Sequence, residues 1–340
     1  SASQYLPGIN LYSAKAYNSD LTWEKTTTYN AGIDFELFQS AILSGSFDAY
    51  IRKTTDLLSK YTLPPGQGLT DQFIGNVGAT EGKGFEFNLN VKAVKSTDFN
   101  LDFNGNIAYN YTKVVDLKGV SQVNSPDGGI PTGTGGYLAF NAPGQQAHSA
   151  HVFQQLYDAS GAAIIGAYAD LNGDHKIDNN DKYYKALRPN WTFGFGTNLN
   201  YKNWDLTASF RGQIGGQTYD SRQITHGFIE HATLGTSLAL NNVLNFYDGS
   251  ANILLNNLNQ NMAYSDYMLQ DASFLRCDNI SLGYKFAKFI NSSSLRVYTS
   301  VNNAFIVTKY KGQDPENFNG IDNNFYPRPR VYTFGLSLDF

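Results

Sequence analysis

Alternation of apolar and polar side chains with a period of two constrains this chain more than any other feature of its sequence. From Trp191 to Tyr201, aromatic and apolar residues with one threonine fill the odd positions, and glycine, threonine and asparagine fill the even ones. Residues 99–111 and the last ten residues repeat the pattern. A period of two is the signature of a β-strand whose two faces meet different surroundings. The sequence therefore predicts an all-β fold.

We expect nine long strands along the chain. Their predicted ranges are 29–39, 41–53, 80–93, 99–111, 191–201, 204–214, 271–287, 294–305 and 331–340. Several keep their alternation for ten or more residues, whereas strands of globular proteins peak near five or six. A tilted strand needs about 9–11 residues to cross a bilayer. This favours a segment of a transmembrane antiparallel β-barrel over a β-sandwich.

The lengths of the connections alternate as regularly as the side chains. Short turns join the strands in pairs, and long connections at about 54–79, 112–190, 215–270 and 306–330 separate the pairs. Outer-membrane barrels have short periplasmic turns and long extracellular loops. Residues 151–169 are a candidate extra hairpin, which gives about 9–11 strands and leaves the count odd. Because bacterial single-chain barrels have an even number of strands, we expect the rest of the wall to come from another polypeptide or an upstream part.

Composition excludes several other classes of protein. The net charge of −4 gives no electrostatic footprint for nucleic acid, and a single cysteine, Cys277, excludes an internal disulfide framework. No charged segment followed by an apolar one opens the chain, so we expect no signal peptide in it. Cys277 is expected to face the interior of the barrel, because Ile280, Leu282 and Tyr284 define the lipid face by alternation.

Several segments resemble the SusC/RagA-type TonB-dependent outer-membrane transporters of Bacteroidetes. They run in order along the whole chain, and the ending is the most specific. The matching stretches are Leu21–Asn30 with Gly32–Phe35, Asn76–Phe87, Asp170–Asp178, Phe274–Tyr284, Val301–Phe305, Lys311–Glu316 and Tyr326–Phe340.

The resemblance implies a 22-stranded barrel that is plugged by an N-terminal domain, of which residues 1–340 would form the C-terminal part of the wall. It also implies a SusD-like lipoprotein above the barrel, TonB acting through an N-terminal part, outer-membrane lipid around it, and import of oligosaccharides or peptides. The terminal strand would insert into the membrane with one face. That face carries Tyr332, Phe334, Leu336, Leu338 and Phe340.

The long 112–190 loop contains a calcium-type turn. Six residues fall at positions 1, 3, 5, 7, 9 and 12 of the pattern, in which a hard cation takes oxygens from one tight loop. They are Asp170, Asn172, Asp174, Lys176, Asp178 and Asp181. His175 stands where the pattern has glycine, and Asp181 where it has the longer glutamate. We expect a structural Ca²⁺ here, with an acidic surface turn held by its own hydrogen bonds as the alternative.

Aromatic residues of the long loops are candidates for binding a substrate, with packing of the loops or docking of the lipoprotein as alternatives. The candidates are Tyr219, Phe228, Tyr264 and Tyr267, with Phe246 and Tyr247 nearby. A short helix is predicted within 221–247. The histidine pairs His148/His151 and His226/His231 lack a third ligand at zinc spacing, so we expect them to be loop residues.

No nucleophile elbow, phosphate-binding loop or dinucleotide fingerprint appears in the sequence. We therefore expect no enzyme. The predicted function is outer-membrane nutrient import, and the alternative is a structural or interaction role as a barrel subunit of a larger surface assembly that transports nothing.

Overall fold

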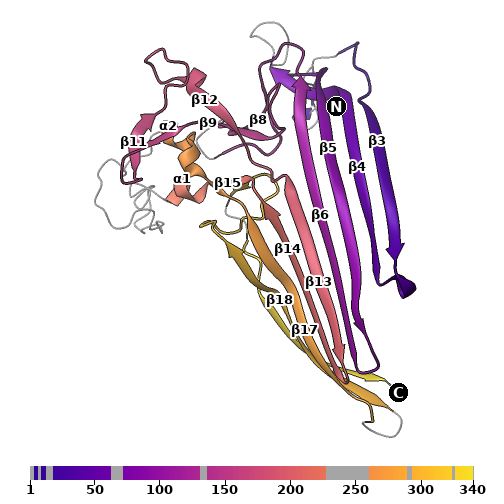
Figure 1. The fold of residues 1–340 in the computed structure, drawn as a ribbon. Coiled ribbons are helices and arrows are strands. Elements are labelled where there is room, and N and C mark those ends of the chain that lie inside the picture. The colour runs from indigo at the N-terminus through magenta and orange to yellow at the C-terminus, as the bar shows by residue number, and fades with distance from the viewer. Residues whose placement is uncertain are drawn as a thin grey trace.

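The computed structural model describes residues 4–6, 9–12, 18–62, 72–130, 136–226, 260–288, 293–323 and 326–339. Within these ranges, nine antiparallel strands form one large sheet (Figure 1). They are β3 (Lys25–Leu37), β4 (Leu43–Thr62), β5 (Gln72–Lys95), β6 (Phe99–Asp116), β13 (Trp191–Tyr201), β14 (Trp204–Ile214), β17 (Phe274–Phe286), β18 (Ser294–Thr308) and β20 (Val331–Asp339). Each pairs with the next in this order, so β3 and β20 are the edges of the described sheet.

All nine predicted strands are present. They pair with one another in sequence order, which is the topology of an antiparallel meander. β4 and β5 are much longer than predicted, with 20 and 24 residues. The additional residues of β4 lie beyond an irregularity at Thr54/Leu57, where Asp56 has a positive φ of 57°. Most of those of β5 lie near or beyond an irregularity opposite Leu57/Leu58, where Val77 is the extra residue. Each bulge shifts the alternation by one residue, which hides the continuation of the strand from a search for period two.

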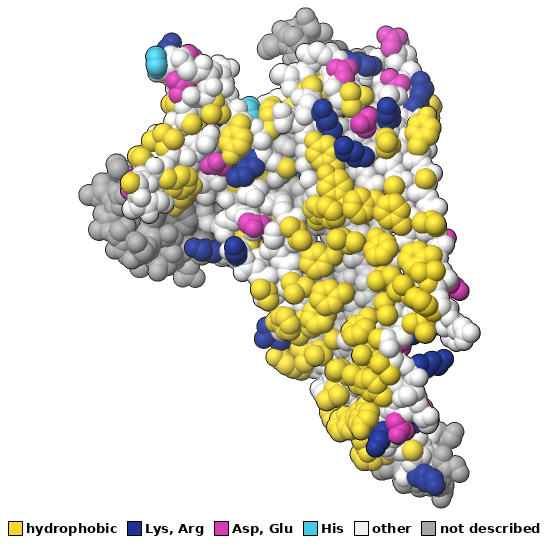
Figure 2. Space-filling view, in the orientation of Figure 1, with side chains coloured by type: hydrophobic (Ala, Val, Ile, Leu, Met, Phe, Trp, Pro, Cys, Tyr) yellow, Lys and Arg dark blue, Asp and Glu magenta, His cyan; other side chains and the backbone are white. Residues whose placement is uncertain are grey.

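The two faces of the sheet differ sharply in chemistry. Pairing places Phe195 opposite Phe210 and Leu199 opposite Leu206 on one side, which we call the apolar face. Figure 2 shows this face: hydrophobic side chains cover its middle, and charged side chains gather toward its two ends. The other side, the polar face, carries mainly asparagine, serine, threonine and glycine in its central part. Apart from a small cluster around Val114 at the loop end of β6, no core of described residues packs against the large sheet. On the apolar face Phe334 is 72% exposed.

The predicted orientation of Cys277 is wrong. A β-bulge between Cys277 and Asn279 inserts Asp278 as an extra residue, so Cys277 pairs with Phe210 and Phe305 on the apolar face. The thiol is buried there. Alternation counted from Ile280 fails at this point because a bulge reverses the parity of every residue beyond it.

The long connections pack together into a separate layer at one end of the sheet, which we call the loop layer (Figure 1). A four-stranded sheet and a three-stranded sheet with one parallel pair form it, together with a hairpin and two short helices. The first sheet contains β7 (Val123–Asn124), β8 (Ala139–Asn141), β9 (Ser149–Phe153) and β12 (Lys182–Ala186), and the second contains β15 (Gln217–Asp220), β16 (Leu269–Asp271) and β19 (Ile321–Asp322). The helices are α1 (Arg222–His226) and α2 (Gln260–Ala263).

The main hydrophobic core of the described chain lies in the loop layer rather than against the large sheet. Its members come from three of the four long connections, and Tyr219, Met268 and Ile321 are almost fully buried. The extra hairpin predicted within 151–169 exists as β10 (Gln155–Tyr157) and β11 (Ala163–Tyr168), and it belongs to this layer. A further pair, β1 (Gln4–Leu6) and β2 (Ile9–Tyr12), precedes the large sheet.

The helix predicted within 221–247 is confirmed as α1, and residues 227–247 lie outside the described ranges. None of the helices that the structure describes is long and apolar enough to cross a membrane.

Candidate functional site

The polar face of the sheet is neutral at its centre and charged toward its flanks. A hollow in the middle is lined by Ser46, Asn88, Asn90, Asn104, Asn106 and Ser209. Acidic residues such as Asp48 and Glu86 lie on β4 and β5, and arginines lie on β14, β17 and β18. Charged side chains need water or partners, which this face can supply if it lines an aqueous space.

One ion pair on the polar face depends on a glycine. Arg296 on β18 binds both carboxylate oxygens of Asp205 on β14, at 2.5 and 2.9 Å, across the intervening strand β17. Gly283 lies beneath this pair, and a Cβ atom there would come within 2.4 Å of the Asp205 carboxylate. Asp205 therefore projects from the polar side of β14.

A cluster of charges fastens the 309–330 connection to the polar face. Arg276 on β17 donates to Asp314 at 2.6 Å, and both side chains are at least 94% buried. Glu316 accepts from Arg211 on β14 at 3.1 Å and from Arg328 at 2.6 Å. We call Arg211, Arg276, Asp314, Glu316 and Arg328 the arginine cluster. The sequence reasoning missed it, although Asp314 and Glu316 lie in one of the family-like stretches.

The loop layer is held together by links between different connections. Asp266 accepts from the backbone N–H of Gln155 at 2.9 Å and from the hydroxyl of Tyr183 at 2.7 Å. Lys182 lies over the ring of Tyr264 at 4.7 Å. The described parts of the 112–190 and 215–270 connections therefore form one folded unit.

His148 links the 112–190 connection to the 309–330 connection. It is 2% exposed, and its Nε2 lies 2.6 Å from the carbonyl oxygen of Asn319. Because a carbonyl can only accept, Nε2 carries the hydrogen and Nδ1 accepts from Ser125 Oγ at 2.7 Å. Burial lowers the pKa of His148 and of His151, which stacks on Tyr184 at 4.4 Å.

The predicted substrate-binding tyrosines lie in or against the core of the loop layer. Tyr219 is fully buried, and its hydroxyl donates to the carbonyl of Ala263 at 2.9 Å. Tyr264 and Tyr267 are partly buried and pack against the same core. Phe228, like Phe246 and Tyr247, lies outside the described residues. The burial and the hydrogen bond of Tyr219 are those of a residue that packs the loops, which is the alternative to substrate binding.

The calcium-type turn adopts a tight loop held by its own carboxylates. Asp170 accepts from the N–H groups of Gly173 and His175, at 2.7 and 2.8 Å. Asp181 is fully buried and accepts from Leu171 and Asp178, both at 2.9 Å. These N–H groups, that of Asp178 foremost, hold the pKa of Asp181 below its usual range.

His175 takes the backbone conformation that glycine has in the calcium pattern, with a φ of 64°. The sharp turn therefore forms although histidine stands in the place of glycine. The left-handed backbone conformation is less favourable for histidine than for glycine, because histidine has a Cβ atom. Among the described residues, no three carboxylates, histidines or cysteines surround a common point that could hold a metal ion.

A pocket of about 700 Å³ opens between the large sheet and the loop layer, at the end where the long connections leave the strands. Its floor is aliphatic, with Leu57, Val77 and Val114 among the lining residues. Polar side chains of Asn124, Asp127, Tyr137 and Asn141 also line it. We call it the rim pocket.

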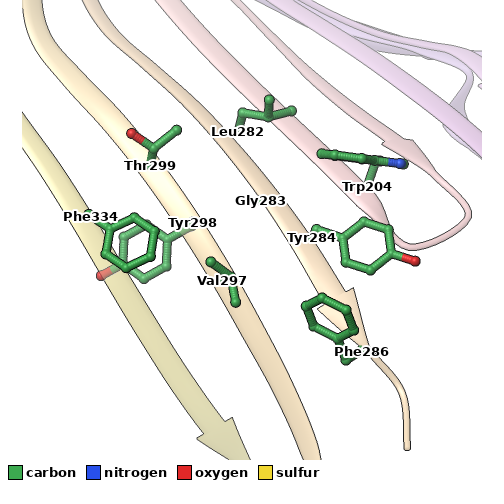
Figure 3. A pocket seen from close by; sticks show the side chains of 9 residues that line it. All are labelled: Trp204, Leu282, Gly283, Tyr284, Phe286, Val297, Tyr298, Thr299 and Phe334. Atoms are coloured by element: carbon green, nitrogen blue, oxygen red, sulfur yellow. The ribbon is translucent and has the colours of Figure 1, made fainter. Parts of the chain in front are cut away.

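A second hollow, of about 490 Å³, lies on the apolar face near the short-turn end of the C-terminal strands (Figure 3). Side chains from β14, β17, β18 and β20 form it, and almost all of them are aromatic or aliphatic. The lining residues are Trp204, Leu282, Gly283, Tyr284, Phe286, Val297, Tyr298, Thr299 and Phe334. We call it the apolar groove.

An apolar outer face, a polar inner face and a layer of folded loops at one end define the wall of a transmembrane β-barrel. Residues 2–304 match the family model described as TonB dependent receptor-like, beta-barrel. The chain belongs to this family, which consists of outer-membrane transporters rather than enzymes.

The chain is 37% identical to the TonB-dependent receptor SusC of Bacteroides thetaiotaomicron over 99% of its own length and 34% of that protein. It is 28% identical to the TonB-dependent receptor P3 of Formosa agariphila, over 95% of the chain and 35% of that protein. The fold is similar to that in a structure of the RagAB peptide transporter, with a TM-score of 0.72 and 23% identity over 100% of this chain and 38% of that one. The chain thus spans about a third of the length of these relatives.

Proposed function

We propose that this chain forms part of the wall of a TonB-dependent importer that takes up oligosaccharides or peptides with a SusD-like lipoprotein. The observation that carries the proposal is the two-faced sheet joined to a folded loop layer. Its apolar face suits lipid, its neutral polar face suits a hydrated passage, and its loop layer suits a docking surface outside the cell. The relationship to SusC and the likeness to a RagAB structure support the same reading.

Copurification tests the partners of this importer. The protein should be extracted from outer membranes in mild detergent together with a plug-bearing portion and a SusD-like lipoprotein. Deletion of its gene should abolish growth on one class of nutrient, and depletion of TonB should have the same effect. Normal growth on every oligosaccharide and peptide tested, together with a stable complex with surface machinery and no plug, would instead establish the structural role.

The rim pocket and the partly buried Tyr264 and Tyr267 are the ligand contacts that we propose. The rim pocket combines an aliphatic surface with the polar groups of Asn124 and Asp127. This combination is common in sites that bind small molecules. Val123→Trp should fill the pocket and weaken ligand binding at least tenfold. Asp127→Asn keeps its volume and tests the carboxylate alone. Unchanged affinity in both variants would remove the pocket from the ligand path.

For the 170–181 loop we propose a structural Ca²⁺ held by Asp170, Asn172, Asp174, Asp178 and Asp181 with the carbonyl of Lys176. Support comes from the spacing of these oxygens and from the turn that His175 makes in the place of glycine. Ion binding would require the carboxylates to converge further than they do in the structure.

Titration calorimetry of the purified protein with Ca²⁺ tests this site. His175→Gly relieves a left-handed conformation that costs about 1–2 kcal/mol in other residues. Because the loop already has this conformation without the ion, the change should stabilise the loop in both states and leave its affinity for Ca²⁺ nearly unchanged. Asp174→Asn should weaken binding. Absence of heat at millimolar Ca²⁺ in all three proteins would leave the loop as a turn held by its own hydrogen bonds.

A further inference from the structure

The apolar groove lies between two rows of larger side chains on the apolar face. The side chains at its base, Val297 and Thr299, are small and stand on β18. Larger ones rise on both sides, with Leu282 and Tyr284 on β17 and Phe334 on β20. Because neighbouring strands lie about 4.8 Å apart, the two walls stand about 9.6 Å apart at the backbone. The result is a trough that runs along β18 (Figure 3). The backbone separation of about 9.6 Å leaves room for one hydrocarbon chain between the two rows of side chains.

Aromatic rings flank the trough on its β17 side, near its short-turn end. Trp204, the first residue of β14, packs edge to face on Tyr284 at 4.8 Å, and Phe286 packs on the other side of Tyr284 at 4.8 Å. Phe286 is the last residue of β17, so these rings mark the short-turn end of the wall. Aromatic side chains at this height are typical of the boundary between lipid tails and headgroups.

Two exposed lysines lie just beyond the rings. Lys202 is two residues before Trp204, and Lys288 is two residues after Phe286. The Lys202 ammonium lies 5.6 Å from the ring centre of Tyr201. Long basic side chains at strand ends extend toward the membrane surface, where lipid phosphates are found. The trough and the lysines therefore offer an apolar slot with positive charge at its mouth.

We infer that the apolar groove retains one phospholipid, with an acyl chain lying along β18 and the phosphate held by Lys202 and Lys288. The short-turn end of an outer-membrane barrel is periplasmic, so the lipid belongs to the inner leaflet. Lipid tails are as apolar as the groove, so burial alone gives no preference. Selection comes from packing in the trough and from charge, and each lysine should favour an anionic lipid about fivefold over a zwitterionic one.

Native mass spectrometry tests this inference on the protein purified from membranes and exchanged into bilayers of phosphatidylethanolamine and phosphatidylglycerol in equal parts. After release into mild detergent, the protein should keep one phosphatidylglycerol. Thr299→Trp fills the trough and should lower retention at least tenfold. The double variant Lys202→Gln/Lys288→Gln should keep a lipid but lose about 25-fold in preference for the anionic one.

Ile33→Trp is the matched control, because Ile33 is 63% exposed on the apolar face of β3, far from the groove in the strand order. It should retain lipid normally. If Thr299→Trp does not insert into the membrane, Thr299→Phe gives a smaller filling of the same trough. Equal retention in the trough variants and the control, or no retained lipid in the unaltered protein, would overturn the inference.

A dimer that shields Thr299→Cys from labelling would show that a second copy covers the groove instead. Nutrient uptake is not measured, so neither outcome depends on the transport proposal.

Discussion

Single residues in the loop layer set how it responds to pH. His148 is neutral, buried and bonded through both ring nitrogens, and its pKa is lowered by burial first and by the charge of Arg188 in addition. A histidine with a lowered pKa in the folded state stabilises that state above its unfolded pKa, about 6.5. The contribution is lost as the pH falls from there through the folded value.

We expect the loop layer to open more often at pH 5.5 than at pH 7.5. The protection factors of the amides in 136–153, which correct the exchange rates for their intrinsic pH dependence, should decrease from pH 7.5 to pH 5.5. His151 adds an effect of the same sign because its pKa is also lowered. In the variant His148→Gln with His151→Gln, the pH dependence should largely disappear. An equal pH response in that variant would assign the effect to other groups.

Cys277 provides a second test at the scale of one residue. The bulge at Asp278 places its thiol among apolar neighbours on the lipid side. A water-soluble maleimide should therefore leave the native protein unlabelled and react fully after denaturation. Rapid labelling of the native protein would indicate that Cys277 faces the aqueous interior, as simple alternation predicts.

At the scale of elements, the arginine cluster decides where the 309–330 connection lies. Arg276 and Asp314 are both buried, so removing one partner leaves the other charge without compensation. Loss of one member of such a pair costs about 3–5 kcal/mol. Exposed pairs behave differently, because water screens them and each contributes about 1 kcal/mol or less.

Arg276→Met should release the 309–330 connection from the wall and make it sensitive to proteases after Lys311. Limited proteolysis of the protein in detergent, followed by mass mapping, would show the new cleavage. Lys25→Met is the matched control, because Lys25 forms an exposed ion pair with Asp56 and is 71% exposed. Similar resistance in the two variants would mean that the arginine cluster does not hold the connection.

At the scale of the whole molecule, the membrane decides which face of the sheet tolerates charge. Phe195 lies in the middle of β13 on the apolar face and is 44% exposed. Phe195→Arg should reduce folding stability by about 2–4 kcal/mol, which is the effect of arginine near the bilayer midplane. Asn104→Arg, on the polar face of the neighbouring strand β6, should cost far less. Denaturant titration of the protein folded into vesicles would compare them, and equal losses would contradict the assignment of the faces.

Much of the wall could be predicted from the sequence because a strand's alternation depends only on neighbouring residues. The nine strands, their order and the two faces follow from period two and from short turns. The predictions failed where a bulge adds one residue, as at Cys277 and beyond Thr54. A bulge is stabilised by pairing with the neighbouring strand, so its position has no local signal comparable to the alternation itself.

The sequence by itself determined a two-faced β-sheet with long connections on one side, because local periodicity and turn lengths specify both. Only the tertiary structure decided that these connections fold into one layer. Arg276 and Asp314 are 38 positions apart, and His148 and Asn319 are 171 positions apart. The core around Tyr219 collects residues from Ile130 to Ile321. Contacts at such separations depend on where the wall holds the ends of each connection, and no short stretch of sequence encodes that.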